Sequence, residues 1–508
     1  MGENKYINPF SKQAEKYALE LDEATISQDA IKLGALVNVI EKRIPDDNHA
    51  SQAQMYYSIG TVYSDLAKFT GISNEKSFQK QLYCFRKSID LIEDDEYLDE
   101  VYSPYIKAFK LNLYTNYANT LSSCGRKISA ITQYRNALRI NPCFGMALGN
   151  LGKIYMDYGF FDFDSGHRDY LYHFSYTLLQ KASRSNDPNT YLEAKEGFQK
   201  LSQYYDSEYI RKFLSRKLNI PNYTYDDMEE KLYREWALQN VLFLNTLNDL
   251  PVEKMCFAND VLHLPDMIVS INAKPVFHGM FNQIKQEYVY ARYECYCSLQ
   301  TLEQPHFADK ETHLINFADY PQYGIRIEQM KSAFKTLYGL FDKIAFFLNS
   351  YFDLGIHERD INFSHIWLSK FGRGNNVYKY KNNLDYKSNF ALASLYWISR
   401  DFYDKFEDSP NPQLKHISIV RNALEHKYVK VTNGWLTKRM DEEVDDLALY
   451  ITEDEFSELT MDLLHIVREA IICLSLCVHI QEEKNRKCNE GKFAPSIPLV
   501  DYDDEWKI

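Results

Sequence analysis

A repeated order of large and small side chains in the first third of the chain constrains the fold most strongly. Residues 111–144 carry it most completely, at Tyr114, Tyr117, Ala118, Leu121, Gly125, Ala130, Tyr134, Ala137, Leu138 and Pro142. The order restarts after about 34 residues, at Leu148, Leu151, Gly152, Tyr155 and Gly159. An earlier unit begins near Ala53. Small residues let two helices cross closely and large ones fill the groove between neighbours, so the pattern predicts stacked helical hairpins.

This pattern resembles the tetratricopeptide repeat. Two amphipathic helices are expected before it, over residues 8–45, and the pattern departs after Gly159, leaving degenerate or capping helices to about residue 215. We therefore predict an all-α protein whose first domain, residues 1–215, consists of tetratricopeptide-type helical repeats. Residues 216–278 are expected to form a linker and an entry segment. The alternative for the first domain is an arbitrary helical array.

The C-terminal half has the apolar spacing of a helical bundle, which we place at residues 279–487, before an acidic tail at 488–508. Its helices are expected from Met280, from Ile327, after Ser388 or Asn389, over 409–429, and after a capping box at Thr452–Glu455. Ala470–Ile480 is apolar nearly all round, so it should be central or at a subunit contact. It is too short to span a bilayer, which needs about 20 apolar residues.

The expected helix over 409–429 carries a polar pair outside its own core. Ile417, Val420, Leu424 and Tyr428 fall within about 40° of Leu424 at 100° per residue, which makes one core stripe. Asn422 and His426 lie about 160° away from Leu424. Arg421 lies on the flank of the stripe.

Residues 421–428, RNALEHKY, resemble the R-x4–6-H motif of the HEPN ribonuclease superfamily and the R-x4-H-x-Y form of HEPN toxins. Four further segments resemble a HEPN branch in which the bundle follows tetratricopeptide repeats: Lys285–Tyr293, Leu340–Phe352, Leu395–Phe402 and Arg468–Leu476. The Leu244–Leu250 segment resembles the entry to that domain. The resemblance implies an up-and-down bundle, commonly dimeric, with two motifs facing across a shared cleft, and metal-independent RNA cleavage.

The motif residues suit this chemistry. A histidine titrates near neutral and can act as base or acid, so His426 would transfer protons. Arg421 would grip a phosphate through its planar guanidinium, and Asn422 would orient the imidazole or donate to a phosphate oxygen. A two-fold dimer would supply a second histidine. The alternative is a histidine on a solvated face and an arginine that pairs with Glu425 at i, i+4.

Three further residues have two interpretations each. Glu287 and Arg292 match polar positions of the family and would line the cleft, or they belong to a charged helix face. For Tyr428, the resemblance to the R-x4-H-x-Y motif implies a target for nucleotidylation by an antitoxin, and the alternative is a residue that packs in the core. Its place in the stripe favours packing.

Composition sets the remaining expectations. The net charge of −13 argues against a protein that coats nucleic acid generally, although a local basic site remains compatible. Neither Asp441–Asp446 nor Glu453–Glu455 offers a convergent ligand set, so we expect no metal and no cofactor. Nine cysteines without C-x-x-C pairs and an N-terminus without an apolar signal core favour the cytoplasm.

Together these features and the resemblance predict a metal-independent endoribonuclease with a repeat domain as sensor or docking arm. The resemblance implies a setting in phage defence or toxin–antitoxin control. The expected partners are RNA, a second copy bound through the bundle, a protein or peptide on the repeats, an antitoxin, and no membrane. The alternative is a non-catalytic adaptor whose bundle only dimerises.

Overall fold

The computed structural model describes residues 6–70, 74–93, 101–205, 214, 218, 220–269, 273–300, 304–311, 321–371, 377–380, 384–386, 388–402, 412–433 and 447–490. Three stretches named above lie outside these residues: the helix start at Ser409–Asn411, the acidic run Asp441–Asp446 and the tail from residue 491. Within the described residues, every regular element is a helix apart from four short strands. The predicted all-α fold class is therefore confirmed.

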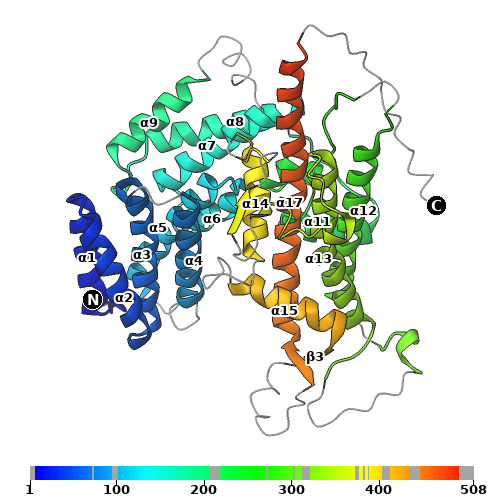
Figure 1. Ribbon diagram of the computed structural model, residues 1–508, viewed down its shortest axis with the longest axis horizontal. Helices are drawn as coiled ribbons and strands as arrows, with labels where there is room; N and C mark the ends of the chain where they lie inside the picture. Colours follow the sequence, from blue (N-terminus) through cyan, green and yellow to red (C-terminus); the bar gives the residue numbers. More distant parts are fainter. Residues whose placement is uncertain are drawn as a thin grey trace.

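The N-terminal part is an array of helices that pack against their neighbours in the chain (Figure 1). Its members are α1 (Lys12–Ile26), α2 (Ala30–Arg43), α3 (His49–Thr70), α4 (Asn74–Ile92), α5 (Ser103–Ser123), α6 (Lys127–Ile140), α7 (Gly145–Phe161), α8 (Ser165–Ser183) and α9 (Leu192–Gln203). The closest packing joins α3 to α4, α5 to α6 and α7 to α8. The predicted hairpins are present, and their identity as tetratricopeptide repeats stays a prediction.

Small residues sit where the hairpin helices cross, as the repeat pattern predicts. A Cβ atom on Gly60 of α3 would lie 2.9 Å from the Phe85 ring of α4. On Gly152 of α7 it would lie 3.1 Å from Leu179 of α8. Side chains at these positions would force the paired helices apart, because real Cβ atoms seldom come so close.

The C-terminal part is a bundle in which α17 stands at the centre (Figure 1). Its helices are α11 (Met228–Gln239), α12 (Val276–Ser298), α13 (Ile325–Tyr351), α14 (Phe390–Asp401), α15 (Pro412–His426) and α17 (Glu453–Cys488). Short 3-10 helices are η3 (Thr246–Asp249), η4 (Met255–Phe257), η5 (Phe307–Asp309) and η6 (Glu358–Asp360). Two expected caps are confirmed: Asn389 accepts the Leu392 N–H at 3.1 Å, and Thr452 accepts the Glu455 N–H at 3.1 Å.

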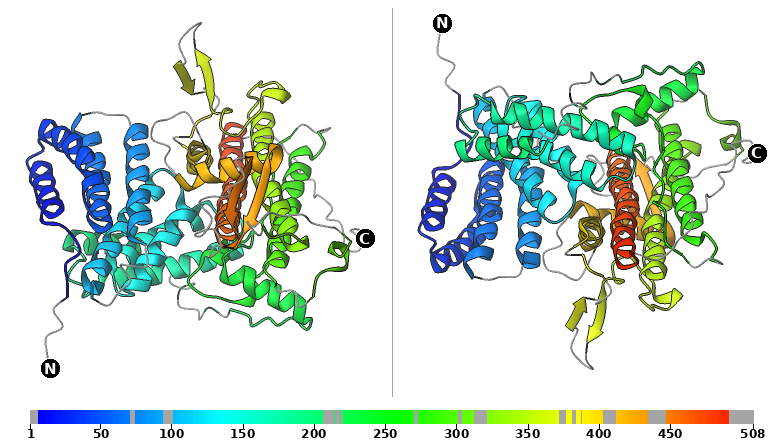
Figure 2. Two further views of the ribbon diagram at one scale, coloured as in Figure 1. Left: turned by 90° about the horizontal axis from the view of Figure 1, so that it is seen from below. Right: turned by 90° about the horizontal axis from the view of Figure 1, so that it is seen from above.

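The strands form two pairs. β1 (Leu368–Phe371) and β2 (Val377–Tyr380) make an antiparallel hairpin that projects from the bundle (Figure 2). β3 (Tyr428–Thr432) pairs in parallel with β4 (Ala448–Thr452), directly before α17. The fourth bundle helix thus ends at His426, and the expectation that it reaches residue 429 is wrong. The run from Tyr428 to Thr432 is aromatic and β-branched, which suits a strand once β4 offers a partner.

Ala470–Ile480 lies in the interior of the molecule, and its side chains are buried except for the partly exposed His479. Of the two expectations for this stretch, the central position is the one observed. Among the described residues, α17 is the one helix long and apolar enough to cross a membrane. Since 83% of its most apolar window is buried inside the protein, this is weak evidence for a membrane span.

The Leu244–Leu250 segment is folded into the bundle. Both Asp249 oxygens accept hydrogen bonds from Arg468 of α17, at 2.9 and 3.0 Å. The Tyr288 hydroxyl of α12 donates to the Leu242 carbonyl at 2.8 Å. Tyr155 of α7 donates to the Asp249 carbonyl at 2.6 Å, so this segment also contacts the repeat array.

A buried ion cluster joins the array to the bundle. Arg86 of α4 and Arg126, which precedes α6, both contact Asp401 at the end of α14, at 2.7 Å each. Arg126 also contacts Glu469 of α17 at 2.9 Å. Beside it, Gly125 has φ of +92°, and a Cβ there would lie 2.4 Å from a backbone oxygen of α14. The array therefore fits closely against α14 and α17, and both views of Figure 2 show it alongside the bundle.

Candidate functional site

The C-terminal half of α15 has one buried face and one exposed face. Ile417, Val420 and Ala423 are buried against the bundle, because they recur at helical spacing. Asn422 and His426 are exposed, as the sequence predicts. The polar pair is therefore presented to solvent by a helix whose other side is fixed in the core.

Arg421 is held between two side chains. Its guanidinium carbon lies 5.2 Å from the centre of the Tyr338 ring on α13. Its Nη1 donates to Oδ1 of Asn422 at 3.0 Å. An ion pair with Glu425 is not among the contacts within the described part of the chain. The stacked arrangement orients the planar cation and leaves further N–H groups for a ligand.

His426 is the last residue of α15 and is exposed. The contacts within the described residues join Arg421 to Asn422 and do not join either to His426. The structure thus places all three motif residues at one helix end, with the arginine and the asparagine in contact and the imidazole open to solvent.

Tyr428 is not a core residue. It begins β3, and 43% of it is exposed. Its hydroxyl lies 3.1 Å from the hydroxyl of Tyr323, and Lys430 Nζ lies 5.3 Å from its ring centre. The packing interpretation is wrong because the helix ends two residues earlier, so the stripe periodicity no longer applies.

Glu287 and Arg292 occupy different environments on α12. Glu287 is partly exposed and forms an ion pair with Lys343 of α13. Arg292 is only 1% exposed; it donates to both carboxylate oxygens of Asp260, at 2.8 and 2.7 Å. Arg292 therefore does not line a cleft and anchors the 242–264 segment instead. Burial acts to raise the pKa of Asp260, but the charge and hydrogen bonds of Arg292 contribute to lowering it below its usual value. The ion pair in turn stabilises the buried Arg292 charge.

A groove between α12 and α13, which the sequence reasoning missed, lies beside Arg421. It has a volume of about 430 Å³, and its lining includes Gln283, Ile284, Asp342, Phe346 and Ile361. Burial raises the pKa of Asp342, while the nearby Arg421 charge acts in the opposite direction. The sequence feature that could have indicated this groove is the Asp342 carboxylate, which lies within the largely apolar run LFDKIAFF of α13, residues 340–347.

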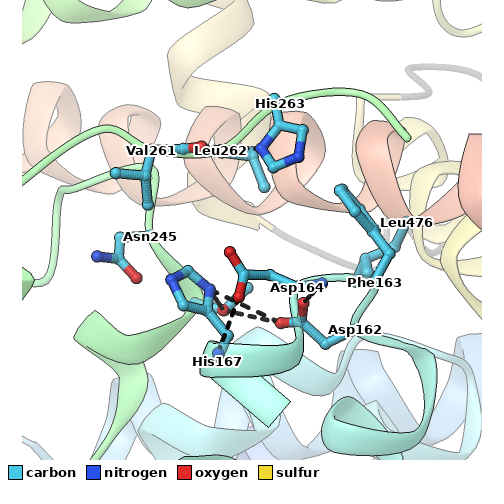
Figure 3. Close-up of a pocket in the computed structure, with 10 residues that line it drawn as sticks. Asp162, Phe163, Asp164, His167, Asn245, Val261, Leu262, His263 and Leu476 are labelled. Atoms are coloured by element: carbon cyan, nitrogen blue, oxygen red, sulfur yellow. Dashed lines mark hydrogen bonds and ion pairs between the residues drawn. The ribbon is translucent and has the colours of Figure 1, made fainter. Parts of the chain in front are cut away.

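A second cavity, of about 20 Å³, lies where the α7–α8 turn meets the 242–264 segment (Figure 3). His167 faces Asp162 there, with Nδ1 3.9 Å from the carboxylate, and the same nitrogen lies 3.1 Å from the Thr246 hydroxyl. This space holds about one water molecule, and its lining contains none of the motif residues. No group of three or more metal-binding side chains occurs among the described residues.

The sequence model of the LA2681-like HEPN family matches residues 268–481. The match spans α12 to most of α17 and contains Arg421, Asn422 and His426. None of the curated proteins and none of the solved structures compared with the chain matches it. HEPN domains are typically ribonucleases, which supports a nuclease or RNA-related role at the family level. Residues 268–481 of this chain are therefore a HEPN-superfamily domain of the LA2681-like family.

Proposed function

We propose that the protein is a metal-independent endoribonuclease of the cytoplasm, which cuts RNA at a site shared by two copies of the HEPN domain. The observation that carries this proposal is the exposed helix end where Arg421, Asn422 and His426 lie together, inside a domain of a family that typically cleaves RNA. The second candidate, a non-catalytic adaptor, predicts no effect from changes at these residues.

In the proposed reaction the nucleophile is the 2′-hydroxyl of the RNA. A base removes its proton, the 2′-oxygen forms a bond to phosphorus, and the bond from phosphorus to the 5′-oxygen breaks. An acid protonates the leaving 5′-oxygen, which leaves a 2′,3′-cyclic phosphate and a 5′-hydroxyl. Arg421 holds the phosphate through N–H groups that its contacts with Tyr338 and Asn422 leave available.

A base and an acid are needed on opposite sides of the phosphorus, and each α15 carries one histidine of the motif. A two-fold dimer brings a second His426 to the same cleft. Ala470–Ile480 is buried within the subunit, so the contact has to use another surface. Exposed apolar side chains beside the motif favour the α15 face, since Ile419 is 46% and Tyr428 43% exposed.

The repeat array would act as a sensor or docking arm for a protein or peptide. The ion cluster at Asp401 supports this role, because it joins the array to α14 and α17. A ligand that shifts the array would therefore change the contacts of these two helices. A setting in phage defence or with an antitoxin fits the R-x4-H-x-Y form of the motif, and the 43% exposure of Tyr428 is compatible with its nucleotidylation.

Cleavage of RNA by the purified chain tests the proposal. His426→Ala should lower the rate by about 10²–10⁴-fold, the usual cost of losing general acid–base help. His416→Ala is the matched control, because His416 lies on the same helix and pairs with Glu455 at 3.4 Å. Equal rates for wild type and His426→Ala would favour the adaptor. In cells, overexpression of a wild-type ribonuclease should be toxic. Arg421→Ala and His426→Ala should relieve this toxicity, whereas an adaptor would be indifferent to both changes.

A further inference from the structure

The groove between α12 and α13 lies near Arg421, for which we proposed a phosphate-binding role. Arg421 lies over Tyr338, and Asp342 follows Tyr338 by four residues on α13. At about 1.5 Å of rise per residue, the two residues lie about 6 Å apart along the helix axis, or roughly one turn. The Arg421 charge acts on the Asp342 carboxyl, which lines the groove. If Arg421 holds a phosphate of an RNA strand, the neighbouring nucleotide of that strand can reach the groove.

The lining combines an aromatic ring with a hydrogen-bond acceptor. Phe346 is 40% exposed although it is apolar, and it lies one turn beyond Asp342 on the same face of α13. Ile284 and Ile361 add apolar walls. Bases of single-stranded RNA are bound in this way, by stacking on aromatic side chains and by hydrogen bonds to their edges. The volume of about 430 Å³ lies within the usual range of small-ligand sites, so it accommodates one base.

A carboxylate accepts hydrogen bonds, so the Asp342 side chain suits some bases better than others. Within the described residues its carboxylate accepts one hydrogen bond, from the Phe363 N–H at 3.3 Å, which leaves further acceptor positions on its two oxygens. Guanine has two adjacent N–H donors on its Watson–Crick edge. Adenine and cytosine place a ring acceptor beside their amino group, and uracil has a single N–H. A carboxylate with two oxygens therefore pairs best with guanine.

We propose that this groove binds a guanine base of the RNA strand, next to the phosphate held by Arg421, with Asp342 on its Watson–Crick edge and Phe346 against its face. The inference rests on the proposed function in taking RNA as the ligand. Free guanine nucleotides share the same chemistry, and the position of Arg421 over Tyr338, about one helical turn from Asp342, favours the strand.

Binding of RNA that cannot be cleaved tests this inference. The probes are two short 2′-O-methyl oligouridylates, one with a single guanosine and one with a single adenosine. The full-length protein should bind the guanosine probe about tenfold more tightly, the usual value of a paired contact to a base edge. Gly339→Phe should abolish the preference, because a Cβ at Gly339 meets nothing within 4 Å and the new ring occupies the groove.

Two further variants complete the test. Asp342→Asn should also abolish the preference, because an amide presents a donor where guanine presents one. Gly197→Phe is the matched control and should keep it, since Gly197 is a helical glycine of α9 with nothing within 4 Å. Equal affinity of the wild-type protein for both probes, or an unchanged preference in both groove variants, would overturn the inference. Equally tight binding of free guanosine monophosphate, unaffected by Arg421→Ala, would overturn the assignment to the strand. The probes lack the reacting hydroxyl, so a failure of cleavage and a failure of the groove are separate results.

Discussion

The guanidinium of Arg126, at the start of α6, lies 2.9 Å from the carboxylate of Glu469, in the middle of α17. Both side chains are almost fully buried, at 4% and 1% exposure. Arg126 also contacts Asp401, which holds Arg86 as well. Two arginines of the array thus meet two carboxylates of the bundle away from water. A buried charge without its partner is costly, so any arrangement of array and bundle that separates these partners is disfavoured.

Asp401→Asn should lower the free energy of unfolding by about 3–5 kcal/mol, because it removes the carboxylate charge that two buried guanidiniums contact. Urea unfolding of the full chain measures this loss. Glu483→Gln is the control, since Glu483 pairs with Arg486 at 2.8 Å on the surface and such pairs contribute about 0–1 kcal/mol. Equal losses in the two variants would show that the cluster does not hold the array to the bundle.

Asp462 of α17 should make stability depend on pH. Burial, with smaller effects from Glu458 and Glu93, raises the pKa of Asp462 to about 6 from its ordinary value of 3.8. The folded state thus binds this proton more tightly than the unfolded chain. The contribution of this proton to the stability of the folded state is fully present below pH 3.8 and is lost as the pH rises through about 6.

Asp462→Asn should therefore stabilise the protein at pH 7.5, by up to about 3 kcal/mol, and the gain should shrink towards pH 4. Urea unfolding of wild type and variant at both pH values gives the difference directly. A gain that is the same at the two pH values would contradict the effect of burial on this carboxyl.

Ile419→Glu should separate the proposed dimer without unfolding the chain. Ile419 lies on the exposed face of α15, and a charge there opposes an apolar contact between two copies. Light scattering should give the dimer mass for the wild type and the monomer mass for the variant, with RNA cleavage lost in parallel. Ile31→Glu, at an 88% exposed isoleucine of α2, should remain dimeric and active. A monomer that still cleaves RNA would contradict the proposal of a shared cleft.

Local patterns in the sequence were enough to place the helices and the exposed polar pair. Ile417 and Val420 are buried and His426 is exposed, because both properties follow from helical spacing over a few residues. The same reasoning wrongly placed Tyr428 in the core stripe of the helix. Tyr428 lies in a strand, and that strand depends on pairing with Ala448, twenty residues away.

Contacts between distant residues account for the other differences. Arg292 has the charge of a surface residue, and only its pairing with Asp260 explains why it is buried. The Arg126–Glu469 contact joins positions 343 residues apart. The groove beside Arg421 is made by α12, α13 and the segment around η6, so no single stretch of sequence contains it.

The ends of the RNA products test the central claim most directly. The wild-type protein is incubated with RNA in EDTA, and the fragment ends are identified by mass. Attack by the 2′-hydroxyl predicts 2′,3′-cyclic phosphate and 5′-hydroxyl ends, no cleavage where the scissile nucleotide is 2′-deoxy, and loss of both products in His426→Ala. Arg421→Lys should lose them too, because an ammonium cannot reproduce the planar contact. Fragments with 5′-phosphate ends that form only with added metal, or full activity of His426→Ala, would contradict the account.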